Sequence, residues 1–462
     1  MLKINEVLYR ILYAKEKRSA QREQFKKQGL PMLSLTLNIP GYPKSTDFTN
    51  RFFDIVLQDL IIFLLAHKVS LVENSAIDVL DEAGRFFIAG LQATDKQLPD
   101  IKILTESFEN QFPVARVLDV DVFSSHAEPV SSGIEKKCFL CENKSAISCM
   151  RDKTHTSEEL RLFIFEKIKD FLSEKQNCDI VSKLSEIAIK SILLEVSVSP
   201  KPGLVDFFSS GSHQDMNYYT FLHSVAALAS FMKDFALAGC VFEGNLKVAL
   251  PNIRAIGLKA ERAMYKATDG VNTHKGIIFL MGISLFTSAY TLKKMGTFHE
   301  LNLVENMQRI CANLVENELI QSVANEPTHG QIAFEKYGMK AAGARLQAEQ
   351  GFPIAFQAIV PLLKQHRFSD LSPDKTKTDN VLKLALVHIM QTIDDTNILY
   401  RKEEATANQL KTLALEVLRE SKSYQELCQF CATENISPGG AADLLSISLF
   451  FYFVEKEFQY TI

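Results

Sequence analysis

The hydrophobic pattern divides the chain into a first part with mixed periods and a second part that is helical throughout. In the first part, apolar residues recur at helical spacing over residues 48–66. Four other segments have the alternation or the short apolar run of a strand: residues 33–39, 76–80, 86–89 and 114–123. This mixture predicts an α+β or α/β domain over residues 1–175.

From residue 180 onward, nearly every segment repeats apolar residues at the spacing of a helix. Residues 157–172 predict a charged helix, and the polar run 173–177 predicts a break after it, where we place the domain boundary. No repeat of about 20–50 residues is visible, which argues against a solenoid. We predict one all-α domain with about ten helices over residues 176–462.

Composition agrees with two globular domains. The chain has 462 residues, whereas a single core stops growing near roughly 250–300 residues. Hydrophobic residues make up 47%, and 51 Lys and Arg balance 55 Asp and Glu to a net charge of −4. No global basic field therefore argues for a nucleic-acid or membrane partner, and we expect neither.

The first residues, the lengths of the apolar runs and the number of cysteines lead us to expect a cytoplasmic protein. The first 27 residues carry several Lys and Arg and lack the apolar run of a signal peptide, so we expect no export. The apolar runs 277–285 and 444–454 are shorter than the roughly 20 residues that span a bilayer. Eight cysteines are too sparse for a disulfide scaffold, so most should be thiols.

One cluster of cysteines has the residue types of a zinc site. Its members follow the spacing Cys138-x2-Cys141-x7-Cys149-x5-His155, which is not that of a standard zinc finger. A reduced cysteine pair in a turn is the plain alternative. The surrounding cations would also suit a phosphate-binding loop without zinc: Lys136, Lys137, Arg151 and Lys153.

Two carboxylates lie on the same side of a predicted strand. Asp119 and Asp121 are two residues apart, a spacing that can hold Mg²⁺ against a polyphosphate. Paired acids of this kind also occur simply as solubilising charges at a sheet edge. Arg116, and Lys44 after the first strand, would supply phosphate contacts in the same place.

In the helical part, two loops precede apolar helices and have the composition of phosphate cradles. In residues 270–276, Asn272 or Thr273 can cap the helix while Lys275 and free backbone N–H groups face an anion. In residues 437–440, Ser437 is the predicted cap, Pro438 would take the first helical position, and Gly439 and Gly440 would let a ligand approach closely. Plain capping explains each loop equally well.

Two further polar clusters adjoin apolar segments of the helical part. His213 and Asp215 follow a Gly- and Ser-rich loop, and residues 394–397 follow an apolar helix. Each cluster alone reads as a solvated loop. Several such clusters in one domain predict a shared polar cleft.

Residues 25–165 resemble the holo-citrate lyase synthase family. The resemblance rests on residues 30–31, residues 39–41 with Lys44, the run Arg116-x2-Asp119-x-Asp121, and the cysteine segment from residue 137 to His155. The resemblance implies a nucleotidyltransferase. Such enzymes move phosphoribosyl-dephospho-CoA onto a serine of the citrate lyase acyl carrier (γ) subunit and release pyrophosphate.

Residues 185–455 are similar to the triphosphoribosyl-dephospho-CoA synthase family. This match is longer and ordered, and its segments are residues 195–196, 200–206, 213–216, 270–276, 343–345, 395–397 and 437–443. The family makes the prosthetic-group precursor from ATP and 3'-dephospho-CoA with release of adenine. The chain thus resembles a fusion of two consecutive steps.

The resemblance implies roles for individual residues. In the helical domain His213 or Asp215 would be the base, His274 a positioning group or acid, and Asp395 and Asp443 the ligands of Mg²⁺. Further substrate contacts would come from Glu195, Lys201, Asp206, Thr273, Lys275, Arg345, Asn397, Arg401, Gly439 and Gly440. In the first domain Asp119 and Asp121 would carry Mg²⁺, and Lys44, Arg51 and Arg116 would bind phosphates. The cations around the cysteine cluster would dock an acidic carrier protein.

Two other functions remain open at this point. One is the maturation of a related acyl-carrier enzyme, such as malonate decarboxylase, which uses the same prosthetic group. The other is a non-catalytic nucleotide sensor joined to a zinc-stabilised module. Release of adenine from ATP and dephospho-CoA separates a synthase from a sensor.

Overall fold

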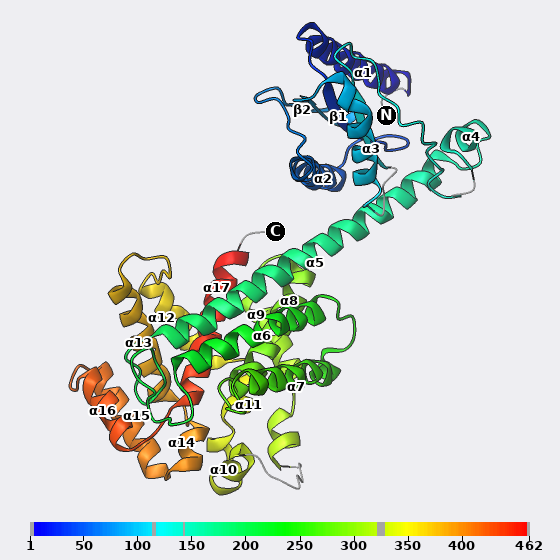
Figure 1. The fold of residues 1–462 in the computed structure, drawn as a ribbon. Helices are drawn as coiled ribbons and strands as arrows, with labels where there is room; N and C mark the ends of the chain where they lie inside the picture. Colours follow the sequence, from blue (N-terminus) through cyan, green and yellow to red (C-terminus); the bar gives the residue numbers. More distant parts are fainter. Residues whose placement is uncertain (1–3, 113–116, 142–143, 321–328, 460–462) are drawn as a thin grey trace. The chain divides into compact units, whose positions relative to one another are not determined.

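The computed structural model describes residues 4–112, 117–141, 144–320 and 329–459. The chain divides into two compact units, Met1–Lys175 and Gln176–Ile462 (Figure 1). Each unit has its own hydrophobic core, so each is described by itself.

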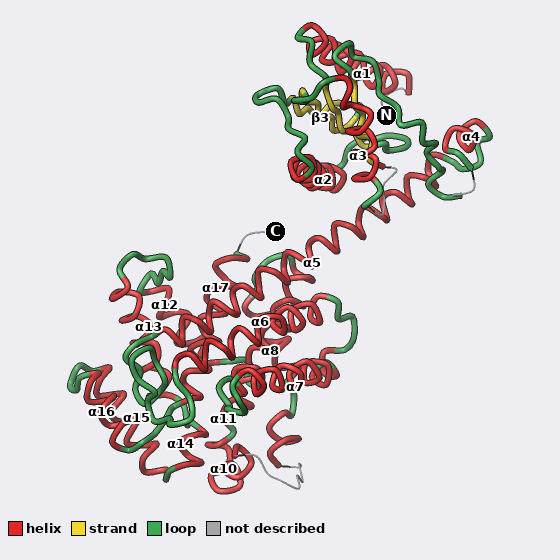
Figure 2. The backbone as a smooth tube through the Cα atoms, in the orientation of Figure 1, coloured by secondary structure: helices red, strands yellow, loops and turns green. Residues whose placement is uncertain are grey.

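The first unit contains a four-stranded sheet with helices on its faces (Figure 2). Its elements are α1 (Ile4–Lys27), β1 (Met32–Leu37), α2 (Asp47–Ala66), β2 (Ile77–Asp81), β3 (Gly84–Gly90), α3 (Leu98–Glu109), β4 (Leu118–Phe123), α4 (Ala146–Arg151) and the start of α5 (Ser157–Ser197). The strand order is β2-β3-β1-β4 and every pairing is antiparallel. An antiparallel sheet makes this unit α+β rather than α/β.

The two faces of the sheet bury different sets of side chains, because successive strand residues point to opposite sides. Leu33 and Leu35 of β1, with Val120 and Val122 of β4, join the core that α2, α3 and the start of α5 complete. On the other face, Phe25 of α1 packs among a smaller cluster. The members of that cluster on the strands are Met32, Phe86, Ile88 and Phe123.

The strands and first helices lie close to their predicted positions. The prediction for residues 33–39 corresponds to β1, and that for residues 48–66 corresponds to α2. The run 114–123 contains β4, which begins at Leu118, while residues 113–116 lie outside the described part of the chain.

The predicted break at residues 173–177 is wrong. Helix α5 runs without interruption from Ser157 to Ser197, through the boundary between the units. The run lacks apolar residues, but it contains no Gly or Pro, and Glu, Lys and Gln are good helix formers. Ile164 and Ile168 belong to the first core and Ile180 to the second, so the polar stretch lies between two packed segments of one helix.

The second unit is all-helical. Its α-helices are α6 (Tyr218–Cys240), α7 (Leu250–Ala267), α8 (Lys275–Met295), α9 (Glu300–Ile310), α10 (His329–Tyr337), α11 (Gly343–Glu349), α12 (Val360–Gln365), α13 (Lys375–Thr392), α14 (Thr396–Arg401), α15 (Glu404–Leu418), α16 (Tyr424–Thr433) and α17 (Gly439–Phe458). Helix α8 packs against α6, α7, α9 and α17 and is buried along most of its length. It is therefore the central element of the core.

Two helices of this unit, α6 and α8, are long and apolar enough to span a membrane by length and composition. The apolar window of α8 is 78% buried and that of α6 is 33% buried. Both contribute side chains to the core of the helical unit, among them Leu228 and Phe235 of α6.

Candidate functional site

In the helical unit, polar segments that are far apart in sequence meet at the start of α17. This helix begins at Gly439 with Pro438 at the N-cap position, so Ser437 does not cap it as predicted. Instead, Ser437 Oγ lies 2.8 Å from His213 Nε2. A β-carbon on Gly439 would lie 2.8 Å from Asn397 Nδ2, so the 397 segment also adjoins this loop.

Asp395 connects two helix starts. Its Oδ1 accepts a hydrogen bond from the Asn397 amide (2.9 Å) at the N-terminus of α14, and its Oδ2 accepts one from the Ala441 amide (3.2 Å) in α17. The side chain is buried, and burial raises its pKa to about 6 although these backbone amides favour the charged form.

Asp443 lies in α17, about one turn after the first residue of that helix, Gly439. The side chain of Asp443 is partly buried, and burial raises its pKa well above the usual value, with smaller contributions from Glu195 and Asp395. A β-carbon on Gly276 would lie 2.0 Å from Asp443 Oδ2, so the first turn of α8 packs directly against this carboxylate. Three carboxyl groups therefore share one buried region.

Of these three carboxyl groups, Glu195 has a cationic partner. The Lys201 ammonium lies 2.7 Å from Glu195 Oε1, and both side chains are buried. The Lys201 amide donates to Asp206 Oδ2 (2.9 Å), and Asp206 also accepts two amides of its own loop. Asp206 therefore holds the loop, while Asp395 and Asp443 form no salt bridge with any described residue.

His274 lies at the N-cap of α8 and is buried. Its Nδ1 is 2.6 Å from Ser224 Oγ, which also accepts a hydrogen bond from Thr273 Oγ1 (2.8 Å). Its Nε2 is buried without a hydrogen-bond partner. Burial, assisted by Lys201, lowers the pKa of His274 to about 3, so the ring is neutral at physiological pH. Ser224 carried no signal in the sequence, because it is one of several small residues in an apolar helix.

His213 is half-buried between groups of opposite charge. Burial lowers its pKa, and Arg401 lowers it further, while Asp215, whose Oδ1 is 3.7 Å from His213 Nδ1, acts in the opposite direction. The imidazole is therefore neutral near pH 7 and can accept a proton.

Two predicted phosphate ligands have other partners. Lys275 pairs with Glu261 at 3.3 Å, and its backbone amide is held by Asn272 Oδ1. Arg345 donates to Glu318 at 2.8 Å, and Arg254 also pairs with Glu318. The sequence analysis did not identify Arg254 or Glu318.

In the first unit, Asp119 and Asp121 point to the face of β4 that does not carry the main core. They lie opposite Thr36 and Ser34 of β1. Burial raises the pKa of Asp121, and the neighbouring Asp119 raises it further. The Lys136 ammonium lies 3.0 Å from Asp119 Oδ1. The two carboxylates are therefore partly buried on the edge strand, and Asp119 contacts the Lys136 ammonium.

Side chains of α3 complete this site along the outer edge of β4. Glu109 Oε1 accepts the Val120 amide (2.7 Å) and Lys102 donates to the Val120 carbonyl (2.9 Å). Lys136 lies 3.6 Å from Glu109, whose pKa burial raises. The sequence did not reveal Glu109 or Lys102, because nothing in α3 marks them as different from surface charges.

Lys44 belongs to a group of cations around the loop that follows β1. Its ammonium donates to the Ile39 carbonyl (2.6 Å), and its pKa is lowered by burial and by the charges of Lys15 and Arg161. Arg161 also donates to the Pro40 carbonyl (2.8 Å). Because Leu37 pairs with Leu118, this loop and Asp119 lie at the same end of the sheet.

Two further phosphate ligands were predicted for the first unit, Arg116 and Arg51. Arg116 falls outside the described residues. Arg51 is exposed on α2.

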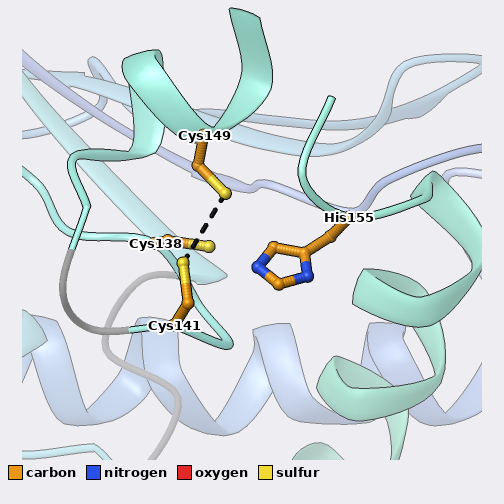
Figure 3. Close-up of side chains that lie close together, drawn as sticks. All are labelled: Cys138, Cys141, Cys149 and His155. Carbon is orange, nitrogen blue, oxygen red and sulfur yellow. Dashed lines mark hydrogen bonds between the residues drawn. The ribbon is translucent and has the colours of Figure 1, made fainter. Parts of the chain in front are cut away.

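The four residues of the cysteine cluster come together in the structure (Figure 3). Their candidate ligand atoms all lie within 4.8 Å of one another, and Cys141 Sγ is 3.7 Å from Cys149 Sγ. Burial opposes ionisation of Cys138, but hydrogen bonds from the Cys141 and Leu140 amides and from the two thiols lower its pKa to about 6. All eight cysteines of the chain are free thiols.

Comparison with known proteins agrees with this division into two sites. The CitG family model, described as ATP:dephospho-CoA triphosphoribosyl transferase, matches residues 181–462. The CitX family model, described as apo-citrate lyase phosphoribosyl-dephospho-CoA transferase, matches residues 6–171. "Protein CitXG" of Leuconostoc mesenteroides subsp. cremoris is 31% identical over 460 residues, which cover 93% of this chain and 94% of the relative. The chain belongs to the CitXG family.

Further relatives support both halves. "Protein CitXG" of Haemophilus influenzae is 30% identical over 464 residues, covering 96% of this chain and 95% of the relative. A Streptococcus mutans protein named "Probable 2-(5''-triphosphoribosyl)-3'-dephosphocoenzyme-A synthase" is 35% identical over 298 residues, covering 60% of this chain and 97% of the relative.

Family membership decides the class of function. The chain is a bifunctional transferase of citrate lyase prosthetic-group synthesis and transfer. These comparisons do not favour maturation of malonate decarboxylase or a nucleotide sensor.

Proposed function

We propose that the helical unit joins the ribose of ATP to the 2'-hydroxyl of 3'-dephospho-CoA and releases adenine. We also propose that the first unit transfers the product to a serine of the acyl carrier subunit of citrate lyase and releases pyrophosphate. The observation that carries the first assignment is the pair of Asp395, which is buried, and Asp443, which is partly buried. Neither carboxyl group has a cationic side-chain partner among the described residues. Ionising both groups costs free energy, because two like charges would lie close together away from water. A bound cation offsets that cost.

Mg²⁺ fits this pair. Carboxylate oxygens are the ligands that it prefers, and both side chains lie beside helix N-termini that also favour the phosphates of a nucleotide. When bound, the ion would neutralise charge on the triphosphate. Glu195 would not compete for it, because Lys201 already balances its charge.

The other residues of the helical site act on the two organic substrates. His213, neutral at working pH, accepts the proton of the attacking 2'-hydroxyl, and Asp215 stabilises the imidazolium that forms. Adenine leaves the anomeric carbon through an oxocarbenium-like transition state and takes up a proton from solvent, which balances the proton that His213 receives. His274 orients substrate rather than donating a proton, since its ring is uncharged.

Phosphate contacts of the helical site come from charged and backbone groups around it. Lys275 and Arg345 exchange their present acidic partners for the triphosphate, and Arg401 lies near enough to His213 to influence its pKa. Thr273, Asn397, Gly439 and Gly440 border the same space through the contacts described above.

In the first unit, the carrier serine attacks the α-phosphorus of the intermediate. Asp119 and Asp121 would hold Mg²⁺, which would neutralise charge on the polyphosphate, and Lys136 keeps the acidic cluster from repelling it. Lys44, with Arg161, binds the pyrophosphate that leaves. The basic residues around the cysteine cluster dock the carrier, and the eight free thiols agree with a cytoplasmic location.

The synthase assignment is tested with the full chain, ATP, Mg²⁺ and 3'-dephospho-CoA. Free adenine and the triphosphoribosylated product are measured by mass spectrometry. Asp443→Asn should lower adenine release by about 100-fold or more, a typical loss for a charge that stabilises a transition state. Asp234→Asn, an exposed acid on α6, is the matched control. Equal rates in both variants would contradict the proposal.

The transferase assignment is tested with the purified intermediate and the apo carrier subunit. Asp121→Asn should prevent the mass increase of the carrier and the release of pyrophosphate. Asp78→Asn on β2, at the opposite edge of the sheet, should behave as the parent protein does. Full transfer by Asp121→Asn would overturn the assignment.

A further inference from the structure

We propose that Cys138, Cys141, Cys149 and His155 bind one structural Zn²⁺, and that this ion fixes Lys136 against the acidic cluster of the first unit. The four residues come from a short hairpin closed by the Lys137–Ser145 bridge, from α4, and from the turn before α5 (Figure 3). A common metal ligand explains why three thiols and an imidazole converge from these separate segments.

The spacing of the donor atoms is that of a tetrahedral zinc site. Zn–S and Zn–N distances of about 2.3 and 2.0 Å place neighbouring donors about 3.5–3.8 Å apart. Cys141 Sγ and Cys149 Sγ are 3.7 Å apart, and all four donor atoms lie within 4.8 Å of one another. A disulfide requires about 2.05 Å between its sulfurs, so these thiols are unbonded.

A second observation concerns His155. Its Nε2 is buried and has no hydrogen-bond partner among the described residues. Figure 3 shows the ring turned toward the sulfurs. A buried nitrogen without a partner destabilises the fold, and coordination to a metal removes that penalty.

The backbone also prepares Cys138 to act as a ligand. The amides of Leu140 and Cys141 donate hydrogen bonds to its sulfur. Donors of this kind stabilise a thiolate, the form of cysteine that binds zinc.

Burial in this segment points in the same direction. Between residues 131 and 156, the buried residues in the described part of the chain are Cys138 and Cys149. Ile134, Ile147 and Met150 are exposed, so they do not form a hydrophobic core. Phe139, which is partly buried, packs against the core of the first unit. A segment this short, with so little apolar burial of its own, ordinarily gains its shape from a metal or a disulfide.

The functional consequence follows from the chain itself and rests on the proposed transferase role. Lys136 precedes the first ligand by two residues, and its ammonium contacts both Asp119 (3.0 Å) and Glu109 (3.6 Å). The zinc-bound hairpin therefore sets the position of the cation that balances these acids. Loss of zinc should release Lys136 from them.

The site is tested first by metal content. Full chain equilibrated with zinc and dialysed should retain one zinc per chain by mass spectrometry, and X-ray absorption should show three sulfur ligands and one nitrogen. Cys149→Ser should lose the metal, whereas Cys178→Ser, a lone exposed thiol in α5, should keep it. A wild-type protein without zinc, or one with an oxygen-rich ligand set, would overturn the site irrespective of how the variants fold.

The positioning role has its own readout. Cys149→Ser and Lys136→Ala should both slow labelling of the carrier by about tenfold or more, while adenine release by the helical unit stays unchanged. Zinc-free protein with full labelling activity would overturn the positioning role. If wild-type protein holds zinc but never labels the carrier, the transferase proposal fails and the metal site stands, so the two failures are distinguishable.

Discussion

At the residue scale, the helical site depends on carboxyl groups whose environment opposes their charge. Asp395 is buried and forms no salt bridge with a described residue, so its pKa lies near 6 instead of near 4, although several backbone amides favour its charged form. For His213 the pKa shifts in the other direction, because burial and the charge of Arg401 lower it and so favour the neutral ring. Asp395 therefore favours the binding of a cation, and His213 is available to accept a proton.

This environment predicts a pH dependence of synthesis. Asp395 must be ionised to hold a cation, and its raised pKa means that protonation begins at a higher pH than for an ordinary aspartate. At limiting Mg²⁺, the rate of adenine release should fall as pH drops through about 6, where an unperturbed carboxyl group would still be charged. Excess Mg²⁺ should shift the midpoint downward. A rate that stays constant between pH 7 and 5 would contradict this role.

Some residues of the sites could be predicted from the sequence and others could not. His213 and Asp395 stand out in the sequence because polar residues adjoin apolar segments, whereas Asp443 was indicated by the family resemblance alone. Glu109, Arg161 and Ser224 give no such signal, because their importance comes from contacts with segments far away in the chain.

At the element scale, helix starts are the structural basis of the helical site. The first turns of α8, α14 and α17 approach one another through Gly276, Asp395 and Gly440, where a β-carbon on Gly440 would lie 3.0 Å from Asp395 Oδ2. Periodicity predicted these helices but not their mutual approach. It also failed at α5, because a polar run in a long helix resembles a linker unless its packing is known.

The close approach of α8 and α17 can be tested with alanine. Gly276→Ala places a methyl group against Asp443, which should destabilise the protein by about 1–3 kcal/mol and reduce adenine release. Gly257→Ala in α7 is the control, because its nearest contact would be an ordinary 3.9 Å to Ile278. Thermal unfolding and adenine release are the measurements. Equal unfolding temperatures and equal rates of adenine release in the two variants would show that a methyl group at residue 276 fits without displacing Asp443.

At the scale of the whole molecule, the two units have separate cores and separate candidate sites. The change in hydrophobic period near residue 175 predicted two domains. The intermediate that links the two reactions is a small molecule, so neither site needs the other in the same chain.

Mixing two inactive variants tests this independence. Asp395→Asn should retain transfer and lose synthesis, whereas Asp121→Asn should do the reverse. Together, with ATP, Mg²⁺ and 3'-dephospho-CoA, they should label the carrier subunit although neither does so alone. No labelling by the mixture, with each partial activity intact, would mean that the intermediate does not leave the chain.

The most direct test of the central claim compares two neighbouring acids. Asp395 lies in the buried carboxyl cluster, whereas Asp394 pairs with Lys411 outside it. With ATP, Mg²⁺ and 3'-dephospho-CoA, Asp394→Asn should release adenine at close to the parent rate, and Asp395→Asn should release about 100-fold less while remaining folded by circular dichroism. Undiminished adenine release by folded Asp395→Asn would contradict the account.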